Sequence, residues 1–108
     1  VSAEAESLKE RKRLAFAGHI TVATVLAGGD ALGAVDVRAM GIPETDAFDL
    51  DDMLDALAEA AEDGFKRMGR KERQDEAAVE EAIRRAVRRE AARIWGKKPH
   101  VEAIVLPA

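Results

Sequence analysis

The chain has two histidines, His19 and His100, and each stands at the start of an apolar stretch rich in β-branched residues. If these stretches form paired strands, the two imidazoles lie near each other, and Glu102 follows close behind His100. Imidazoles and a carboxylate are ligands that zinc accepts, but two histidines from separate stretches make a weak site. Histidines at the start of strands are more often partly exposed residues without a ligand. We therefore expect no metal, cofactor-binding or catalytic residue here.

Acidic side chains gather between residues 44 and 63, where nine of them occur without a base. A calcium loop of the EF-hand type needs oxygen ligands at alternating positions, with a glycine inside the loop and a glutamate at its end. This segment has no glycine. Capping of a helix by Asp49, with Asp51 and Asp52 at the positive end of the helix dipole, explains the acids better. We expect no divalent cation to bind this segment.

The sequence also lacks the residue spacing of a phosphate-binding loop and of a catalytic triad. The stretch AGGDALG at residues 27–33 has neither the GxxxxGK[ST] pattern nor the GxGxxG pattern of a phosphate-binding loop. The only serines, Ser2 and Ser7, lie at the start of the chain and form no Ser-His-Asp set. The sequence therefore predicts no nucleophilic catalysis.

Basic side chains are concentrated near the end of the chain. They are Arg84, Arg85, Arg88, Arg89, Arg93, Lys97 and Lys98. A cationic helix face of this kind can bind phosphates in a salt-dependent way. Trp95 is the only aromatic residue among them, which leaves little to stack on nucleic-acid bases. We favour a structural helix whose basic face meets solvent, the acidic segment or a partner; the alternative is an RNA-binding module that uses this face.

The composition limits the class of protein. A length of 108 residues fits one domain, and a net charge of -4 argues against a dedicated nucleic-acid binder. The absence of cysteine excludes disulfides and thiolate metal sites. The longest apolar runs, such as residues 20–27, are far shorter than the roughly 20 residues of a membrane-spanning helix, and no cleavable signal precedes them. We expect a cytoplasmic protein without a membrane partner.

Three stretches predict strands. Residues 19–27 are apolar on both alternating sets, which is typical of a strand that is central or covered on both faces. Residues from about 32 to 40 alternate in polarity, and the short link before them favours an antiparallel hairpin with the first strand. Residues 100–106 predict a last strand, which the direction of the chain places parallel to the first.

Two longer stretches and one short one predict helices. A short helix is expected within the first 18 residues, with Ser7 as its cap and Gly18 as its stop. Apolar residues recur every three or four positions from Asp49 to Gly69 and again from Asp75 to Gly96. The predicted fold is a two-layer α+β domain of order α-β-β-α-α-β. In it, a three-stranded mixed sheet is covered on one face by two long antiparallel helices.

Three segments together resemble the C-terminal domain of ribonuclease J, a nuclease of the metallo-β-lactamase and beta-CASP family. LKERKRLAFAGHITVATVL has the family's L-x-x-R-x-x-L-x-x-x-G helix before an apolar strand. AVRREAARIWGKKPHVEAIVLP has its Arg-rich helix, basic turn with proline and closing strand. VRAMGIPETD is similar to its s-R-G-[FI] segment, with Arg38, Gly41 and Ile42 at the matching places. The alanine-rich composition suggests a proteobacterial member.

The resemblance implies a detached, non-catalytic part of a zinc-dependent 5′-to-3′ exo- and endoribonuclease of RNA processing and decay. The family's zinc ligands lie in an HxHxDH motif that is absent from this chain, so no catalytic or metal residue is carried over. The implied partners are the rest of the parent nuclease, a second subunit and, through the parent enzyme, RNA. Residues 1–18 would be a helix or linker from the preceding nuclease domain. Residues 19–108 would form the C-terminal α+β domain, which supports oligomerisation and full activity.

Overall fold

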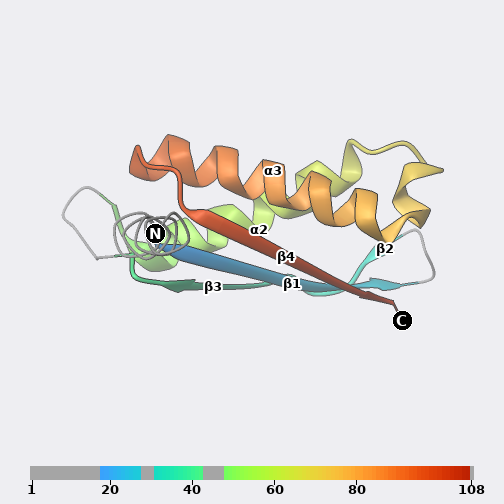
Figure 1. The fold of residues 1–108 in the computed structure, drawn as a ribbon, viewed down its shortest axis with the longest axis horizontal. Helices are drawn as coiled ribbons and strands as arrows, with labels where there is room; N and C mark the ends of the chain where they lie inside the picture. Colours follow the sequence, from blue (N-terminus) through green and yellow to red (C-terminus); the bar gives the residue numbers. More distant parts are fainter. Residues whose placement is uncertain (1–17, 28–30, 43–47, 108) are drawn as a thin grey trace, which may run out of the picture.

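A computed structural model of the protein describes residues 18–27, 31–42 and 48–107. The described chain is an α+β domain in which a sheet forms one layer and two helices form the other (Figure 1). Its elements are β1 (His19–Ala27), β2 (Ala31–Leu32), β3 (Asp36–Met40), α2 (Leu50–Lys66), the 3-10 helix η1 (Glu72–Gln74), α3 (Glu76–Trp95) and β4 (His100–Pro107).

The strand β1 is the centre of the sheet. It pairs with β3 in antiparallel register, with Thr21 opposite Arg38, and with β4 in parallel register, with Thr21 opposite Glu102. The short strand β2 pairs with the far end of β1, where Leu26 lies opposite Leu32. Because β4 runs along one edge of β1 from His19 to Leu26, β2 and β3 must share the other edge.

The predicted second strand is interrupted. Between the pairs Ala23–Asp36 and Leu26–Leu32, β1 advances by three residues and its partner by four. One extra residue on one strand of an antiparallel pair is a β-bulge, which bends the strand and breaks its ladder locally. Gly33 stays attached to β1, because its N–H donates to the carbonyl of Val25 at 2.8 Å.

Both long helices begin at an aspartate. The carboxylate of Asp49 accepts from the N–H groups of Asp51 and Asp52, and that of Asp75 accepts from Ala77 and Ala78. These bonds satisfy amides that have no partner inside a first helical turn. The helix α3 ends at Gly96 in the left-handed conformation that glycine adopts most easily. The apolar repeat predicts a helix up to Gly69, which is too long, because α2 ends at Lys66 with Arg67 in right-handed geometry.

The helices cover one face of the sheet. Alternate residues of β1 and β4 point into the helical layer and meet residues that recur every four positions on α2 and α3. The buried core consists of Ile20, Val22, Leu26, Ile42, Met53, Leu57, Ala61, Phe65, Val79, Ile83, Val87, Ala91, Val101 and Val105. At about 25 cal/mol per Å² of apolar surface removed from water, this contact between layers is the main stabilising term of the fold.

The expected architecture needs two corrections. The described sheet has four strands and not three, because the bulge divides the second predicted strand into β2 and β3. The described elements begin with a strand, in the order β-β-β-α-η-α-β, and not with a helix. The helix expected in the first 18 residues falls on residues 1–17, which lie outside the described part of the chain.

Candidate functional surfaces

The basic residues of α3 are partly neutralised by acids of the same helix. Glu81 accepts from Arg84 in a forked pair at 2.6 and 2.9 Å and from Arg85 at 2.8 Å. Near the end of the helix, two nitrogens of Arg93 donate to a single oxygen of Glu90, Oε1. The hydrogen bond from Arg84, followed by that from Arg85, holds the pKa of Glu81 below its usual range. The hydrogen bond from Arg93 lowers the pKa of Glu90 likewise.

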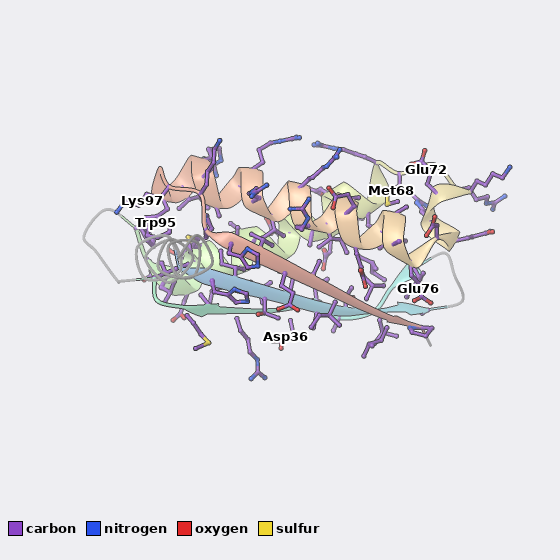
Figure 2. The ribbon with its side chains drawn as sticks, viewed as in Figure 1. Asp36, Met68, Glu72, Glu76, Trp95 and Lys97 are labelled. Carbon is purple, nitrogen blue, oxygen red and sulfur yellow. The ribbon has the colours of Figure 1, made fainter. Side chains whose placement is uncertain are left out.

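The remaining basic residues are less engaged. Among the described residues, Arg88 and Arg89 are exposed and take part in no ion pair. The ammonium of Lys97 lies over the Trp95 ring, 5.5 Å from its centroid, and Figure 2 shows both side chains at the same end of α3. Three of the seven predicted contact residues are therefore tied to neighbouring carboxylates. The free cationic surface is smaller than the sequence indicates.

The acidic helix does not neutralise the basic one. Within the ranges that the structure describes, no ion pair joins α2 to α3, although the two helices pack side by side. Gly64 allows this close packing, because a Cβ added there would lie 2.9 Å from the Cβ of Ala86. Asp51, Asp52 and Asp55 of α2 stay exposed, and Asp51 and Asp55 line a hollow beside β3. The solvent-exposed side of the helical layer therefore carries an acidic stripe on α2 and a basic stripe on α3.

The second candidate surface is the face of the sheet that the helices leave open. Asp36 points away from the helical layer there (Figure 2). Four large apolar side chains on this face are partly or largely exposed, namely Val25 (39%), Met40 (72%), Ile104 (37%) and Leu106 (55%). We call this surface the open face. It comprises His19, Thr21, Ala23 and Val25 of β1, Asp36, Arg38 and Met40 of β3, and His100, Glu102, Ile104 and Leu106 of β4.

The two histidines meet on the open face. Their rings stack with centroids 5.0 Å apart, and Nε2 of His19 lies 3.6 Å from Oε2 of Glu102. In the described part of the chain, no set of three or more His, Cys, Asp or Glu side chains is arranged to hold a metal ion. The stacked imidazoles and Glu102 form a partly exposed cluster on strands β1 and β4.

The edge of β4 that does not pair with β1 is partly closed by Glu80 of α3. The N–H of His100 donates to the carbonyl of Gly18 on the β1 side at 3.1 Å, so the odd-numbered amides of β4 point outward. The outward N–H of Val105 donates to Oε1 of Glu80 at 3.3 Å. Arg84, four residues after Glu80 on α3, donates to Glu81 and leaves Glu80 free to reach β4.

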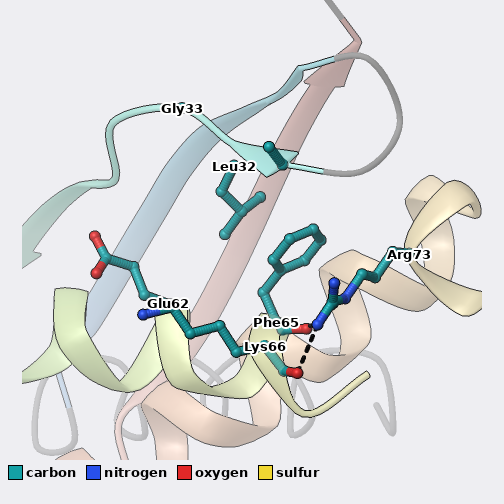
Figure 3. Close-up of a pocket in the computed structure, with 7 residues that line it drawn as sticks. Leu32, Gly33, Glu62, Phe65, Lys66 and Arg73 are labelled. Atoms are coloured by element: carbon teal, nitrogen blue, oxygen red, sulfur yellow. Dashed lines mark hydrogen bonds between the residues drawn. The ribbon is translucent and has the colours of Figure 1, made fainter. Parts of the chain in front are cut away.

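A pocket of about 440 Å³ opens between β2 and the end of α2 (Figure 3). Leu32 and Phe65 line its apolar side, and Arg73 lies at its rim. The guanidinium of Arg73 donates to the carbonyls of Phe65 and Lys66 at 3.3 and 2.6 Å and sits over the Phe65 ring. Arg73 therefore satisfies carbonyls at the end of α2. This role of Arg73 could not be predicted from the sequence, because the acceptors are backbone atoms.

Comparison with known families shows which family this chain belongs to. Residues 6–108 match the family described as "Ribonuclease J C-terminal domain". The chain belongs to this family. The ribonuclease J domain is also 40% identical over 103 residues to a protein named Ribonuclease J from Sinorhizobium meliloti (strain Sm2011 / Rm2011 / 2011). That alignment covers 94% of this chain and 18% of the relative, so the domain spans less than a fifth of the relative's length.

The structure gives a physical reason for one segment of the family resemblance. Gly18 has φ +73°, and a Cβ at this residue would lie 2.6 Å from Cγ1 of Ile42. The same Gly18 carbonyl accepts from His100 at the start of β4. In this ribonuclease J domain, the glycine before β1 and the isoleucine after β3 therefore close one end of the sheet together. Of the helices that the structure describes, none has the length and apolar character needed to cross a membrane.

Proposed function

We propose that this domain is a non-catalytic support of a zinc-dependent ribonuclease J that degrades RNA from the 5′ end and also cuts internally, in the cytoplasm. The parent nuclease would supply the zinc, the catalytic residues and the RNA path. The domain would hold the subunits of the nuclease together and so support its full activity. Family membership and the small share of the relative's length that the chain covers support this division of work.

The observation that carries the proposal is the open face. Soluble domains rarely leave a sheet with several large, neighbouring apolar side chains uncovered unless another surface packs on it. Here Met40 and Leu106 are more than half exposed, and no charged side chain of the face is buried. An antiparallel sheet with one wet face normally carries polar residues on that face. The apolar residues of β4 and β1 thus favour contact with protein.

The proposal is tested by removing the domain from its parent nuclease. The whole nuclease and a version that lacks residues 18–108 are compared by sedimentation and by degradation of a 5′-monophosphorylated RNA. We expect the shortened enzyme to sediment as a smaller species and to lose activity while its bound zinc content is unchanged. Equal size and equal activity of the two forms would refute the support role.

A second function is favoured by Arg88 and Arg89. Their guanidinium groups are exposed, lie one turn above the ion-paired Arg84 and Arg85, and take part in no ion pair within the described residues. In this alternative, the basic face of α3 binds RNA phosphates, with Lys97 and Lys98 extending it. Affinity would then fall steeply as salt is added, because phosphate binding releases counterions.

The alternative is tested with charge reversal. Changing both Arg88 and Arg89 to Glu should abolish binding of single-stranded RNA at low salt if α3 is the contact surface. The matched control changes Arg67 and Arg70 to Glu, which alters the net charge equally at a different place. If the unchanged domain fails to bind RNA at low ionic strength, this second function is excluded.

A further inference from the structure

The strand β3 forms one edge of the sheet. It pairs with β1, and β4 lies on the opposite side of β1 (Figure 1). The carbonyl of Val25 accepts a backbone hydrogen bond on the β2 side, so the odd-numbered residues of β1 direct their backbone groups toward β2 and β3. Thr21 and its register partner Arg38 are therefore a hydrogen-bonded pair. The N–H and C=O groups of Val37 and Ala39, on either side of Arg38, then point outward.

The two edges of the sheet differ in how well they are protected. Among the residues that the structure describes, none donates to or accepts from the outward groups of Val37 and Ala39. At the opposite edge, Glu80 accepts from the N–H of Val105 at 3.3 Å, and Pro107 has no N–H. A row of unpaired amides and carbonyls is a template on which another strand can pair. The edge of β3 is therefore the one that is ready to accept a strand.

A hollow of about 330 Å³ lies beside this edge, between β3 and α2. Val35 and Val37 line it from the sheet, Leu54 and Ala58 line it from α2, and all four are only half-buried. Successive side chains of a strand point to opposite faces, so a strand added to β3 would lay every second side chain over the hollow. Those side chains would cover apolar surface that the domain itself leaves partly exposed.

The charge around the hollow indicates which side chains fit it. The exposed acids Asp51 and Asp55 line it together with Asp36, and none of the described lining residues is basic. Arginine and lysine lay their methylene stems along apolar surface while the charged group stays in water. Such a side chain can cover Leu54 with its stem and bring its cation to the carboxylates of Asp51 and Asp55. A second copy of β3 fits less well, because it would bring two acidic hollows together.

We infer that the edge of β3 binds an extended segment of another protein, in which arginine or lysine alternates with β-branched residues. The backbone groups of Val37 and Ala39 pair with this segment and supply affinity, while the hollow supplies specificity, as in other cases of strand addition. The basic side chains lie over the hollow and face Asp51 and Asp55, which fixes the register of the added strand. This edge is separate from the open face, and its partner does not depend on the proposed support function.

The probe for the test is a short blocked peptide of alternating arginine and valine, added to the 108-residue chain at low salt and followed by NMR. Amide hydrogen exchange at Val37 and Ala39 should slow by at least about tenfold at saturating peptide, because both N–H groups then donate to the peptide. A peptide of alternating glutamate and valine should bind at least about tenfold more weakly, because its charges repel the acids of the hollow.

Methylated peptides test whether the contact is a strand ladder. One peptide is methylated at its arginine nitrogens and the other at its valine nitrogens. Only every second amide of an added strand faces β3, so one of the two peptides should lose binding and the other should keep it. Each peptide is the control of the other, and neither changes the fold of the domain.

A matched pair of variants tests the hollow. Asp55→Arg should weaken binding of the arginine peptide at least about fivefold, because it replaces an attraction with a repulsion. Glu59→Arg makes the same charge change one turn further along α2, outside the lining of the hollow, and should leave binding unchanged. Equal effects of the two variants, binding by both methylated peptides, or no binding of the arginine peptide up to about 1 mM would overturn the inference.

Discussion

The two faces of the sheet are built from the same strands but have different neighbours. The even-numbered residues of β1 are buried under α2 and α3, whereas the odd-numbered residues lie on the open face. Ile20 on the covered side has no exposed surface, while Ile104 on the open side is 37% exposed. The same residue type is thus a core residue on one face and a candidate contact residue on the other.

Because successive side chains of a strand point to opposite faces, residues that stabilise the fold and residues that can contact another molecule alternate along the same strand. A residue that points toward the helices contributes to folding of the single chain, and a residue that points away contributes only when another surface arrives. Substitutions on the two faces should therefore affect different measurements. Those on the covered face should change the free energy of unfolding, and those on the open face should change the affinity of the domain for whatever surface packs on that face.

The largest effect is expected from a matched pair of isoleucines. Ile20→Ala should lower the free energy of unfolding by about 2 to 5 kcal/mol, because it leaves a cavity under the helices. Ile104→Ala should lower it by about 1 kcal/mol or less when measured on the monomer at low protein concentration. Urea denaturation followed by circular dichroism measures both. Equal losses for the two variants would contradict the separation of the faces.

The covered face also depends on how closely the two helices approach. Gly64→Ala puts a methyl group 2.9 Å from Ala86, and the helices must shift apart. Overpacking outweighs the better helix propensity of alanine, so we expect a net loss of about 1 to 2 kcal/mol by urea denaturation. Gly69→Ala is the control, since a Cβ there meets nothing within 4 Å. A stabilised Gly64→Ala variant would mean that α2 and α3 pack more loosely than described.

A smaller effect is expected at the edge between the two faces. Glu80→Ala removes the acceptor of the Val105 N–H and should cost about 1 kcal/mol in urea denaturation. It also frees the Val105 N–H on the outer edge of β4 to pair with another strand, so aggregation on standing should increase. Glu59→Ala on the exposed side of α2 is the control. Unchanged stability together with unchanged solubility would show that Glu80 does not protect this edge.

The smallest effect concerns the ion pairs on the water-facing side of α3. The pKa values of Glu81 and Glu90 are lowered in the folded chain by their arginine partners. A lowered folded pKa contributes stability above the unfolded value of about 4.3, and this contribution is lost as the pH falls through the folded pKa. The urea midpoint of the unchanged protein should exceed that of a Glu81→Gln, Glu90→Gln variant at neutral pH. The two midpoints should converge in acid, and a constant difference would contradict this origin.

The sequence predicted the elements whose boundaries depend on neighbouring residues. The strand at His19–Ala27 and the Asp49 cap of α2 are confirmed, because β-branched runs and Asp caps act locally. The family was also correctly identified from short segments. The break between β2 and β3 was missed, because a bulge is set by the register of the partner strand and leaves no mark in local polarity.

The functional surfaces were less predictable. The basic face of α3 was visible as a run of charge, but its partial neutralisation by Glu81 and Glu90 depends on side-chain geometry that spacing alone does not fix. The sequence predicted that the helices cover only one face of the sheet, but not which residues lie on the other face, because Val25, Ile104 and Leu106 look like core residues in the sequence. Whether such residues are buried depends on how many helices cover the sheet. That is a property of the tertiary structure.

The position of β1 also has a consequence for synthesis of the protein. Its neighbour β4 begins 81 residues later, since His19 pairs with His100. At ribosomal rates of roughly 5 to 20 residues per second, one edge of β1 waits about 4 to 16 seconds for that neighbour to be made. A nascent chain in this interval exposes an apolar strand with unsatisfied amides. A chaperone that binds β1 until translation has passed Pro107 would therefore keep this strand from pairing with other chains.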